Sequence, residues 1–291
     1  MSFVSFRKSL SRPRLKPLFI AAVAGSALAL SACSIFDSNN GGGDDNDAKY
    51  VERPVEQIYA DAWKRIRDGS WAEAAKQFDE VERQHPYSIW ARRAMLMSAF
   101  CSYQANKYQD AISTADQFIQ LHPGSPEVAY AFYLKAMSLY EQIVDVGRDQ
   151  TNTEQALTAL EDVVQRFPNT EYARDALLKI DLTQDHLAGK EMAVGRYYLH
   201  KGDYIGAINR FRVVVERYQR TPQIAEALER LTEAYYALGV YDEAKTAAAV
   251  LGANYPGSRW YQDSYDLLVA HNMKPDANPA SWISKLFRSP V

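Results

Sequence analysis

The chain has 291 residues, of which 47% are hydrophobic, and its 33 basic and 36 acidic side chains give a net charge of −3 at pH 7. This balance excludes the strongly basic surface that binding to nucleic acid requires. The two cysteines, Cys33 and Cys101, are too few for a disulfide framework, so we expect Cys101 to be a small buried hydrophobic residue.

The first 32 residues are organised like a secretory signal peptide. Five basic and no acidic side chains lie before residue 17, and an uncharged apolar run follows from Pro17 to Ala32. This run is shorter than the roughly 20 residues that span a bilayer, so a permanent transmembrane helix is not expected. Removal of residues 1–32 would leave 28 basic against 36 acidic groups, a net charge of −8. That charge argues against nucleic acid and anionic lipid as partners.

The sequence Leu30-Ser31-Ala32-Cys33 resembles the lipobox of bacterial lipoproteins. The resemblance implies cleavage between Ala32 and Cys33 and a covalent lipid, diacylglycerol and palmitate, on Cys33. Several acyl chains anchor a protein stably where a single chain does not. Because Ser34 and not Asp follows Cys33, the resemblance implies the inner leaflet of the outer membrane. The alternative is an ordinary signal peptide followed by a chance cysteine.

Residues 33–49 are rich in Gly, Asn and Asp and offer almost nothing to bury. This composition predicts a flexible, lipidated tether. A chain of this length would hold the folded part on the order of 20 Å from the lipid.

Beyond Tyr50 the sequence repeats a unit in which a polar or Gly turn precedes an aromatic residue and an Ala, and a Pro closes the unit. Four Ala–Pro pairs are each twelve residues apart: Ala74 and Pro86, Ala111 and Pro123, Ala156 and Pro168, Ala244 and Pro256. The unit around Ala207 departs from this spacing, because its Pro222 comes three residues late. Apolar residues recur at helical spacing, and no stretch alternates convincingly enough to predict a strand.

Helix pairs of this kind resemble tetratricopeptide repeats, and they predict an all-α fold. We expect a right-handed superhelical array of about five pairs, with boundaries near 53–87, 88–124, 125–169, 170–221 and 222–257. The proline-free stretch 170–200 predicts a long helix of about 45 Å that links the two halves, although Gly189 and Gly195 could break it. The extra length of the third unit, IVDVGRDQTNT, predicts a loop between its helices.

The domain organisation follows from these units. Residues 50–124 hold the first two repeats, residues 125–274 hold repeats three to five and a capping helix, and residues 275–291 form a proline-punctuated tail. In this tail, Trp282, Ile283, Leu286 and Phe287 share one short apolar face. The face could dock on a partner or a membrane surface, or pack on the chain's own last repeat.

No motif in the sequence predicts catalysis or a metal site. The five histidines lack zinc-helix spacing, NNGGGDD neither follows a strand nor opens a helix, and a G-x-S-x-G elbow is absent. We therefore expect a binding protein with no enzymatic activity, no metal and no cofactor besides the lipid. A hidden enzyme would need convergent ionisable groups that only a structure reveals.

Four segments go beyond the repeat pattern: HPYSIWARRAMLMSAF, YAFYLKAMSLYEQI with VGRDQ, LAGKEMAVGRYYLHKGDYIGAINRF, and ALERLTEAYYALG. With the lipobox, tether and repeats, they make the mature chain similar to the BamD family of outer-membrane assembly factors. The resemblance implies a periplasm-facing lipoprotein scaffold of the β-barrel assembly machinery. Its partners would be the periplasmic domains of the barrel component, unfolded outer-membrane proteins and other lipoproteins of the complex.

The resemblance also implies two binding surfaces. The amino-terminal repeats would form a client groove, lined by Tyr59, Trp63, Tyr87, Trp90, Phe100 and Tyr103, although an aromatic residue at a repeat position is more often interhelical core. The carboxy-terminal repeats would dock on the barrel component, with Arg210 as the leading contact and Arg196 and Arg217 behind it; the alternative for Arg210 is a solvated helix face.

Two other functions remain open at this point. One is a lipoprotein with a peptidoglycan or competence role, and the other is a periplasmic repeat adaptor such as a cell-division coordinator. The latter usually lacks a lipobox and carries a coiled coil, and no sustained heptad occurs here.

Overall fold

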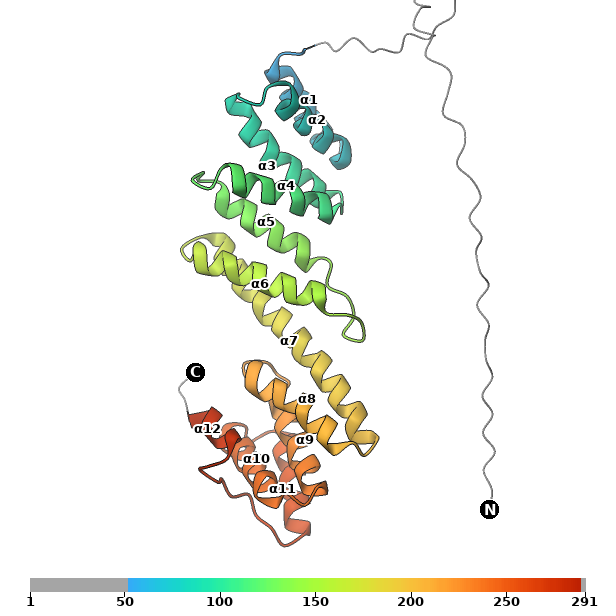
Figure 1. Cartoon of the computed structure of the whole chain (residues 1–291), viewed down its shortest axis with the longest axis vertical. Helices are drawn as coiled ribbons and strands as arrows, with labels where there is room; N and C mark the ends of the chain where they lie inside the picture. Colours follow the sequence, from blue (N-terminus) through green and yellow to red (C-terminus); the bar gives the residue numbers. More distant parts are fainter. Residues whose placement is uncertain (1–51, 289–291) are drawn as a thin grey trace, which may run out of the picture. The chain divides into compact units, whose positions relative to one another are not determined.

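The computed structural model describes residues 52–288, so the predictions for the signal peptide, for Ala32 and Cys33 and for the tether lie outside the described residues. The predicted all-α fold is confirmed for this part of the chain, which holds twelve helices and no strand (Figure 1). The helices are α1 (Val55–Arg67), α2 (Trp71–Gln84), α3 (Ile89–Gln104), α4 (Tyr108–Leu121), α5 (Val128–Tyr140), α6 (Thr151–Arg166), α7 (Glu171–His200), α8 (Tyr204–Arg217), α9 (Ile224–Ala237), α10 (Tyr241–Asn254), α11 (Arg259–Ala270) and α12 (Trp282–Arg288). The right-handed winding and the repeat boundaries stay predictions.

Prolines end four of the even-numbered helices. The residue before each proline is pushed out of the helical conformation by a clash with the proline ring. His85, before Pro86, has φ −134° and ψ 58°, and His122, before Pro123, has φ −130° and ψ 51°. The last helical residue therefore lies two positions before the proline, at Gln84 in α2 and at Leu121 in α4.

Most of the odd-numbered helices are followed by a residue with a positive φ, in the left-handed backbone conformation. At the end of α1, Gly69 has φ 72°, and the N–H of Ser70 donates to the carbonyl of Arg65 at 2.8 Å. This is the Schellman arrangement, which satisfies carbonyls that the helix end leaves open. The same position is taken after α3, α7, α9 and α11 by Asn106, Gly202, Gly239 and Asn272.

The alanines that mark the repeats lie in the interior of the helix array. Ala74, Ala111, Ala156, Ala207 and Ala244 are all fully buried. Each helix from α1 to α10 packs against the next one along the chain, and the odd-numbered helices α1 to α11 also touch one another in series. Small side chains at these crossings let the helices interdigitate at interior density.

The long helix predicted between the two halves is confirmed as α7, which runs for 30 residues without interruption. Its first half packs on α6, where Ala176 and Ile180 join the cluster of Leu160. Its second half packs on α8, where Ala188 and Met192 join the cluster of Phe211. A single helix therefore contributes to the cores of both halves.

The predicted loop in the third unit occupies residues 141–150, between α5 and α6. The ammonium group of Lys190 on α7 fixes this loop, since it donates to the carbonyls of Gly147 and Arg148, both at 3.3 Å. None of the described helices has both the length and the hydrophobicity that crossing a bilayer requires.

The thiol of Cys101 is free and fully buried, as predicted. Burial is the main cause that raises its pKa to about 12, and the charge of Asp79 adds to it. This thiol is therefore a packing group and not a reactive one.

Candidate binding surfaces

The first surface is an aromatic cluster at the contact of α1, α2 and α3. The Tyr59 ring lies 4.8 Å from the Trp90 ring and 5.3 Å from the Phe78 ring, centroid to centroid. Trp63 adjoins both Tyr59 and Phe78 at 6.5 Å and keeps 38% of its surface exposed. Phe78 is fully buried, so this cluster is mainly interhelical packing with one open edge at Trp63.

The other predicted groove residues lie at different points of the first two repeats. Phe100 meets Trp71 edge to face at 5.9 Å, and Tyr103 meets Tyr108 at 6.0 Å. The Tyr103 hydroxyl donates to Glu141 Oε1 at 3.3 Å, and burial followed by this carboxylate raises the pKa of Tyr103 to about 12. Tyr59 therefore makes ring contacts with both Trp63 and Trp90, whereas Phe100 packs against the same buried cluster through Trp71 and not through these rings.

Tyr87 stands apart from both groups. It lies in the turn between α2 and α3 and is completely exposed, at 101% of its reference area, and Ile89 beside it is 82% exposed. A large apolar side chain that makes no packing contact is an available anchor for a partner.

A further aromatic group, which the sequence analysis missed, continues along the odd-numbered helices. Tyr172 on α7 lies 5.4 Å from Tyr130 and 5.2 Å from Tyr133, both on α5. The Tyr133 hydroxyl donates to Asp175 at 2.7 Å, and burial together with this bond raises the pKa of Tyr133. The spacing of Tyr130 and Tyr133, three residues apart on one helix, was the available signal.

A hollow of about 600 Å³ opens between α4, α5 and α6. Phe132 and Leu139 supply apolar lining, and Lys135 pairs with Asp116 across it at 2.7 Å. Its amide side chains, from Gln109, Gln142, Asn152 and Gln155, present both donors and acceptors. Such a lining suits the backbone of an extended polypeptide, but no sequence motif pointed to it.

The second surface carries the three predicted arginines. Arg196 on α7 pairs with Glu226 on α9 at 2.9 Å, and Arg210 on α8 pairs with Glu191 on α7 at 3.3 Å. Both arginine side chains keep 44% of their area exposed. Arg217, in the last turn of α8, is exposed. Arg196 and Arg210 are therefore held by carboxylates of their own chain while an edge of each remains open to a partner.

A partly buried ionic network lies next to Arg196. Arg230 contacts Glu229 at 3.1 Å and Glu233 at 2.8 Å, and its guanidinium lies 5.6 Å from the centre of the Trp260 ring. Burial raises the pKa of Glu229 to about 7; Arg230 opposes this shift, whereas Glu233, Asp263 and Glu226 add to it. Although Glu229 Oε2 lies near Arg230 Nε, neither atom has a partner with hydrogen-bond geometry.

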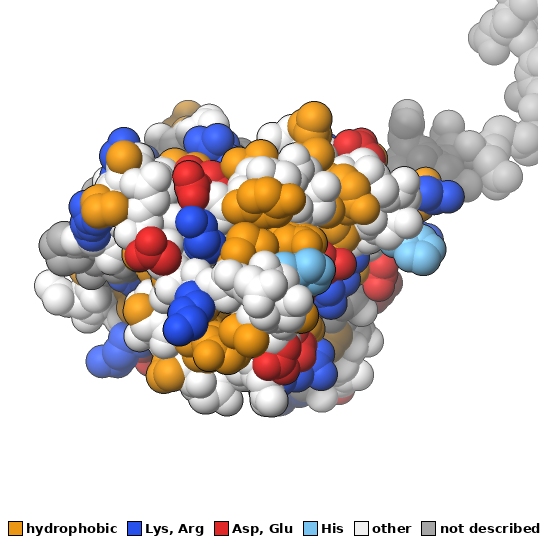
Figure 2. All heavy atoms as spheres, turned by 90° about the horizontal axis from the view of Figure 1, so that it is seen from below, with side chains coloured by type: hydrophobic (Ala, Val, Ile, Leu, Met, Phe, Trp, Pro, Cys, Tyr) orange, Lys and Arg blue, Asp and Glu red, His pale blue; other side chains and the backbone are white. Residues whose placement is uncertain are grey.

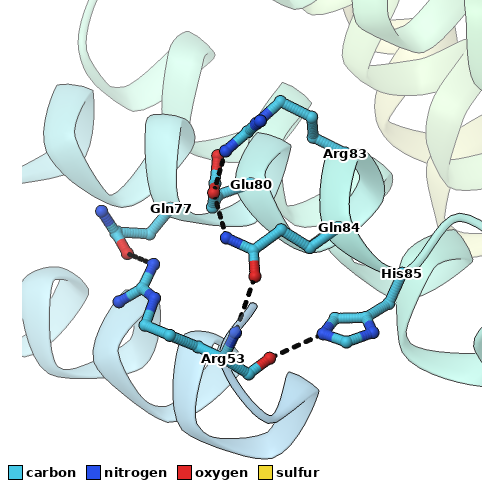
Figure 3. Close-up of polar contacts among 6 residues, drawn as sticks. All are labelled: Arg53, Gln77, Glu80, Arg83, Gln84 and His85. Carbon is cyan, nitrogen blue, oxygen red and sulfur yellow. Dashed lines mark hydrogen bonds and ion pairs between the residues drawn. The ribbon is translucent and has the colours of Figure 1, made fainter. Parts of the chain in front are cut away.

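Polar side chains at the end of α2 hold the residues that precede α1 (Figure 3). The backbone N–H of Arg53 donates to Gln84 Oε1 at 3.0 Å, and its carbonyl lies 2.7 Å from His85 Nε2. The Arg53 guanidinium donates to Gln77 Oε1 at 3.4 Å and faces Asp61 at 3.6 Å. The entry point of the chain into the repeats is therefore fixed through both backbone polar groups of Arg53.

The end of the array that α10 and α11 form carries hydrophobic side chains on its surface (Figure 2). Val240, Tyr241, Tyr265 and Val269 are each between 40% and 48% exposed. No group of three or more potential metal ligands occurs within residues 52–288.

Comparison with known proteins gives a consistent result. The YfiO family model, described as an outer membrane lipoprotein, matches residues 51–251. A relative from Caulobacter vibrioides named outer membrane protein assembly factor BamD is 56% identical over 79% of this chain and 75% of its own. The relative of the same name from Rickettsia prowazekii is 44% identical over 76% of this chain and 88% of its own. A solved structure of a TPR protein from Thermus thermophilus aligns at 17% identity over 72% of this chain and 98% of its own, with a TM-score of only 0.34.

Proposed function

This chain belongs to the YfiO family of outer membrane lipoproteins, together with the BamD assembly factors, and we propose that it assists the assembly of outer membrane proteins as they do. The observation that carries this proposal is the 56% identity over 230 residues, which extends far beyond the repeat pattern. Within this function we propose a scaffold that binds the barrel component and presents unfolded clients to it.

Two features of the described residues support this division of roles. The amino-terminal repeats offer Tyr87 and the open edge at Trp63 as apolar anchors, which suits an unfolded chain that carries aromatic residues. The carboxy-terminal repeats offer Arg210, Arg196 and Arg217, which suit carboxylates of a folded partner. We assign client binding to the first surface and docking on the barrel component to the second.

The membrane attachment that we propose is the lipid on Cys33. The chain would then face the periplasm from the inner leaflet of the outer membrane. Other lipoproteins of the complex would bind beside it. Because lipid, client and barrel component would be held on one chain, their effective concentration rises without any bond being made or broken. The role is therefore one of binding and not of catalysis, with the lipid as the one attached group.

The experiment that tests the proposal is crosslinking of the tagged chain in intact cells, followed by identification of the captured proteins. We expect a β-barrel protein with periplasmic domains, and outer-membrane proteins caught before insertion. Capture of cell-wall material independent of any barrel protein would instead support the peptidoglycan role and contradict ours. Depletion of the chain should in parallel lower the amount of folded outer-membrane barrels.

A further inference from the structure

The carboxy-terminal tail folds back on the repeats. Residues 271–281, after α11, form no helix. The next helix, α12, packs against α10 and against the hydrophobic cluster that α8, α9 and α10 form together. Ile283 is fully buried in this cluster, and Trp282, Leu286 and Phe287 pack against its edge. Of the two alternatives for the apolar face of the tail, the structure shows packing on the chain's own repeats.

The surface beneath α12 is built to hold a tryptophan. The Trp282 indole N–H donates to the Tyr235 hydroxyl at 3.1 Å, and the Arg212 guanidinium lies over its ring at 4.8 Å from the centre. Arg212 pairs with Glu216 on the same helix at 2.6 Å, and this ion pair does not involve the tail. The guanidinium is therefore held in position on α8 independently of the Trp282 ring. A hydrogen-bonded indole stacked on a fixed cation is the kind of contact that dominates binding between proteins.

The tail consists of one short helix and an exposed linker. A helix of seven residues is too short to persist by itself in water, so α12 depends on the surface for its shape. The connecting residues from His271 to Ala280 are mostly exposed. Four hydrogen bonds join residues 276–281 to α10: Asp276 N–H to Lys245 O at 3.3 Å, Thr246 Oγ1–H to Asp276 O at 3.5 Å, Asn278 N–H to Thr246 Oγ1 at 3.1 Å, and Ser281 Oγ–H to Glu243 Oε2 at 2.6 Å.

Apart from Ile283, every buried residue of this cluster comes from α7, α8, α9 or α10. Phe211, Leu228, Leu231 and Leu251 are fully buried among α8, α9 and α10. The match to the family model ends at residue 251, before α11 begins, so the features that define the family do not include the tail.

We propose that the surface formed by Arg212, Tyr235 and the apolar side chains beneath Ile283 is a binding site for a short amphipathic helix of another protein. The tail occupies this site in the isolated chain and gives way to the partner. The tail itself shows what fits: adjacent Trp and Ile, then Leu and Phe one turn later, with basic residues such as Lys285 and Arg288 between and after them. An apolar helix face that fills a groove in this way is a recurring mode of recognition between proteins.

The test uses the full chain and a fluorescent peptide of residues 277–291 as the probe. In an Ile283→Asp variant of the full chain the tail is released, and we expect it to bind the probe at least tenfold more tightly than the wild-type chain does. A probe that itself carries Ile283→Asp is the matched control and should not bind. Equal binding by the wild type and a folded variant would overturn the proposal, and so would loss of the helical fold in the variant, since the tail would then be part of the core.

A second measurement does not depend on that variant. A protease site inserted after Ala277 in the exposed linker allows the tail to be cut from the folded chain. We expect the fragment to separate during gel filtration, whereas a fragment that stays bound at low concentration would contradict an exchangeable tail. Both experiments use purified components, so their outcome is independent of whether the chain assembles outer membrane proteins.

Discussion

The ring of Phe211 on α8 lies directly against the backbone of Gly195 on α7. A β-carbon at residue 195 would lie 2.4 Å from Cε1 of this fully buried ring. The glycine inside the long helix is thus required by the packing of its neighbour.

Replacement of Gly195 by alanine should destabilise the chain. The alanine would gain about 1 kcal/mol in helix propensity, but it would force the buried ring to move, which costs about 1–3 kcal/mol. We expect the free energy of unfolding in urea to fall by about 1 kcal/mol. Gly189 is the matched control in the same helix, because a β-carbon there would meet only Val146 at 3.7 Å. Gly189→Ala should therefore raise stability, and equal effects at both sites would contradict this explanation.

Glu229→Gln should stabilise the chain at alkaline pH. The pKa of this carboxyl rises from 4.5 in the unfolded chain to about 7 in the folded one, so the folded state binds more protons between these values and stability falls as pH increases. At pH 8 the glutamine removes the free-energy cost of burying a charged carboxylate, which is on the order of 3 kcal/mol. At pH 4 the carboxyl is already protonated, so the substitution should have no such effect. Urea unfolding at both pH values measures the difference. Glu233→Gln, at a side chain with 41% exposure, should change stability by less than about 1 kcal/mol at either pH. A destabilised Glu229→Gln variant at pH 8 would mean that the pairing with Arg230 outweighs burial.

Arg210→Glu should weaken capture of the barrel component in a pull-down by roughly tenfold, about 1.4 kcal/mol. The change places a carboxylate where the proposed partner offers one, and it also opposes Glu191 within the chain. Glu191→Gln separates these two effects, because it frees Arg210 without removing its charge. Capture should survive Glu191→Gln; if both variants lose it equally, the pair acts inside the chain and not on the partner.

Tyr87→Ala should reduce binding of a client peptide that ends in an aromatic residue, without a change in stability. The side chain is completely exposed, so unfolding should shift by no more than about 0.5 kcal/mol. Tyr59→Ala is the contrasting variant, since it removes a ring packed on Phe78 and Trp90 and should cost about 2 kcal/mol. Fluorescence anisotropy with the peptide gives the binding, and undiminished binding by Tyr87→Ala would remove this residue from the client surface.

Cys33→Ala should release the chain from the membrane fraction, because no acyl chain can then be attached. Cys101→Ala, which alters only a buried thiol, should leave the chain membrane-bound. Immunoblotting of fractions after a carbonate wash measures both. Retention of the Cys33→Ala variant would contradict the lipid anchor.

The fold could be predicted largely because the repeats mark their own boundaries. Pro86 and Pro123 fix the ends of helices through a local steric effect, and Ala74 or Ala111 marks a buried helix face, so neither inference needs distant contacts. Gly195 shows where this reasoning stops. In the sequence, a glycine at this position suggested a break in the helix. In the structure, it makes room for the ring of Phe211, which lies sixteen residues further along the chain.

The binding surfaces were harder to predict, because periodicity does not say which side of a repeat a residue faces. The turn after Pro86 made Tyr87 and Trp90 the better candidates for exposure, yet only Tyr87 is wholly exposed, and the Trp90 ring packs on Tyr59 at 4.8 Å. The pairing of Arg210 with Glu191 depends on how α7 and α8 cross, which spacing along the chain does not reveal. The hollow between α4, α5 and α6 has no sequence signature at all, since its lining comes from ordinary helix faces.

Because α7 is one continuous helix, its length in residues sets the rotation of the later repeats about the helix axis relative to the earlier ones. One residue inserted at its middle would turn every later helix by about 100° and advance it by about 1.5 Å relative to the earlier ones. A loop of any composition would absorb such an insertion, whereas a rigid helix transmits it in full. The length of this segment, in whole residues, is thus a constraint on evolution separate from the identity of the side chains that it carries.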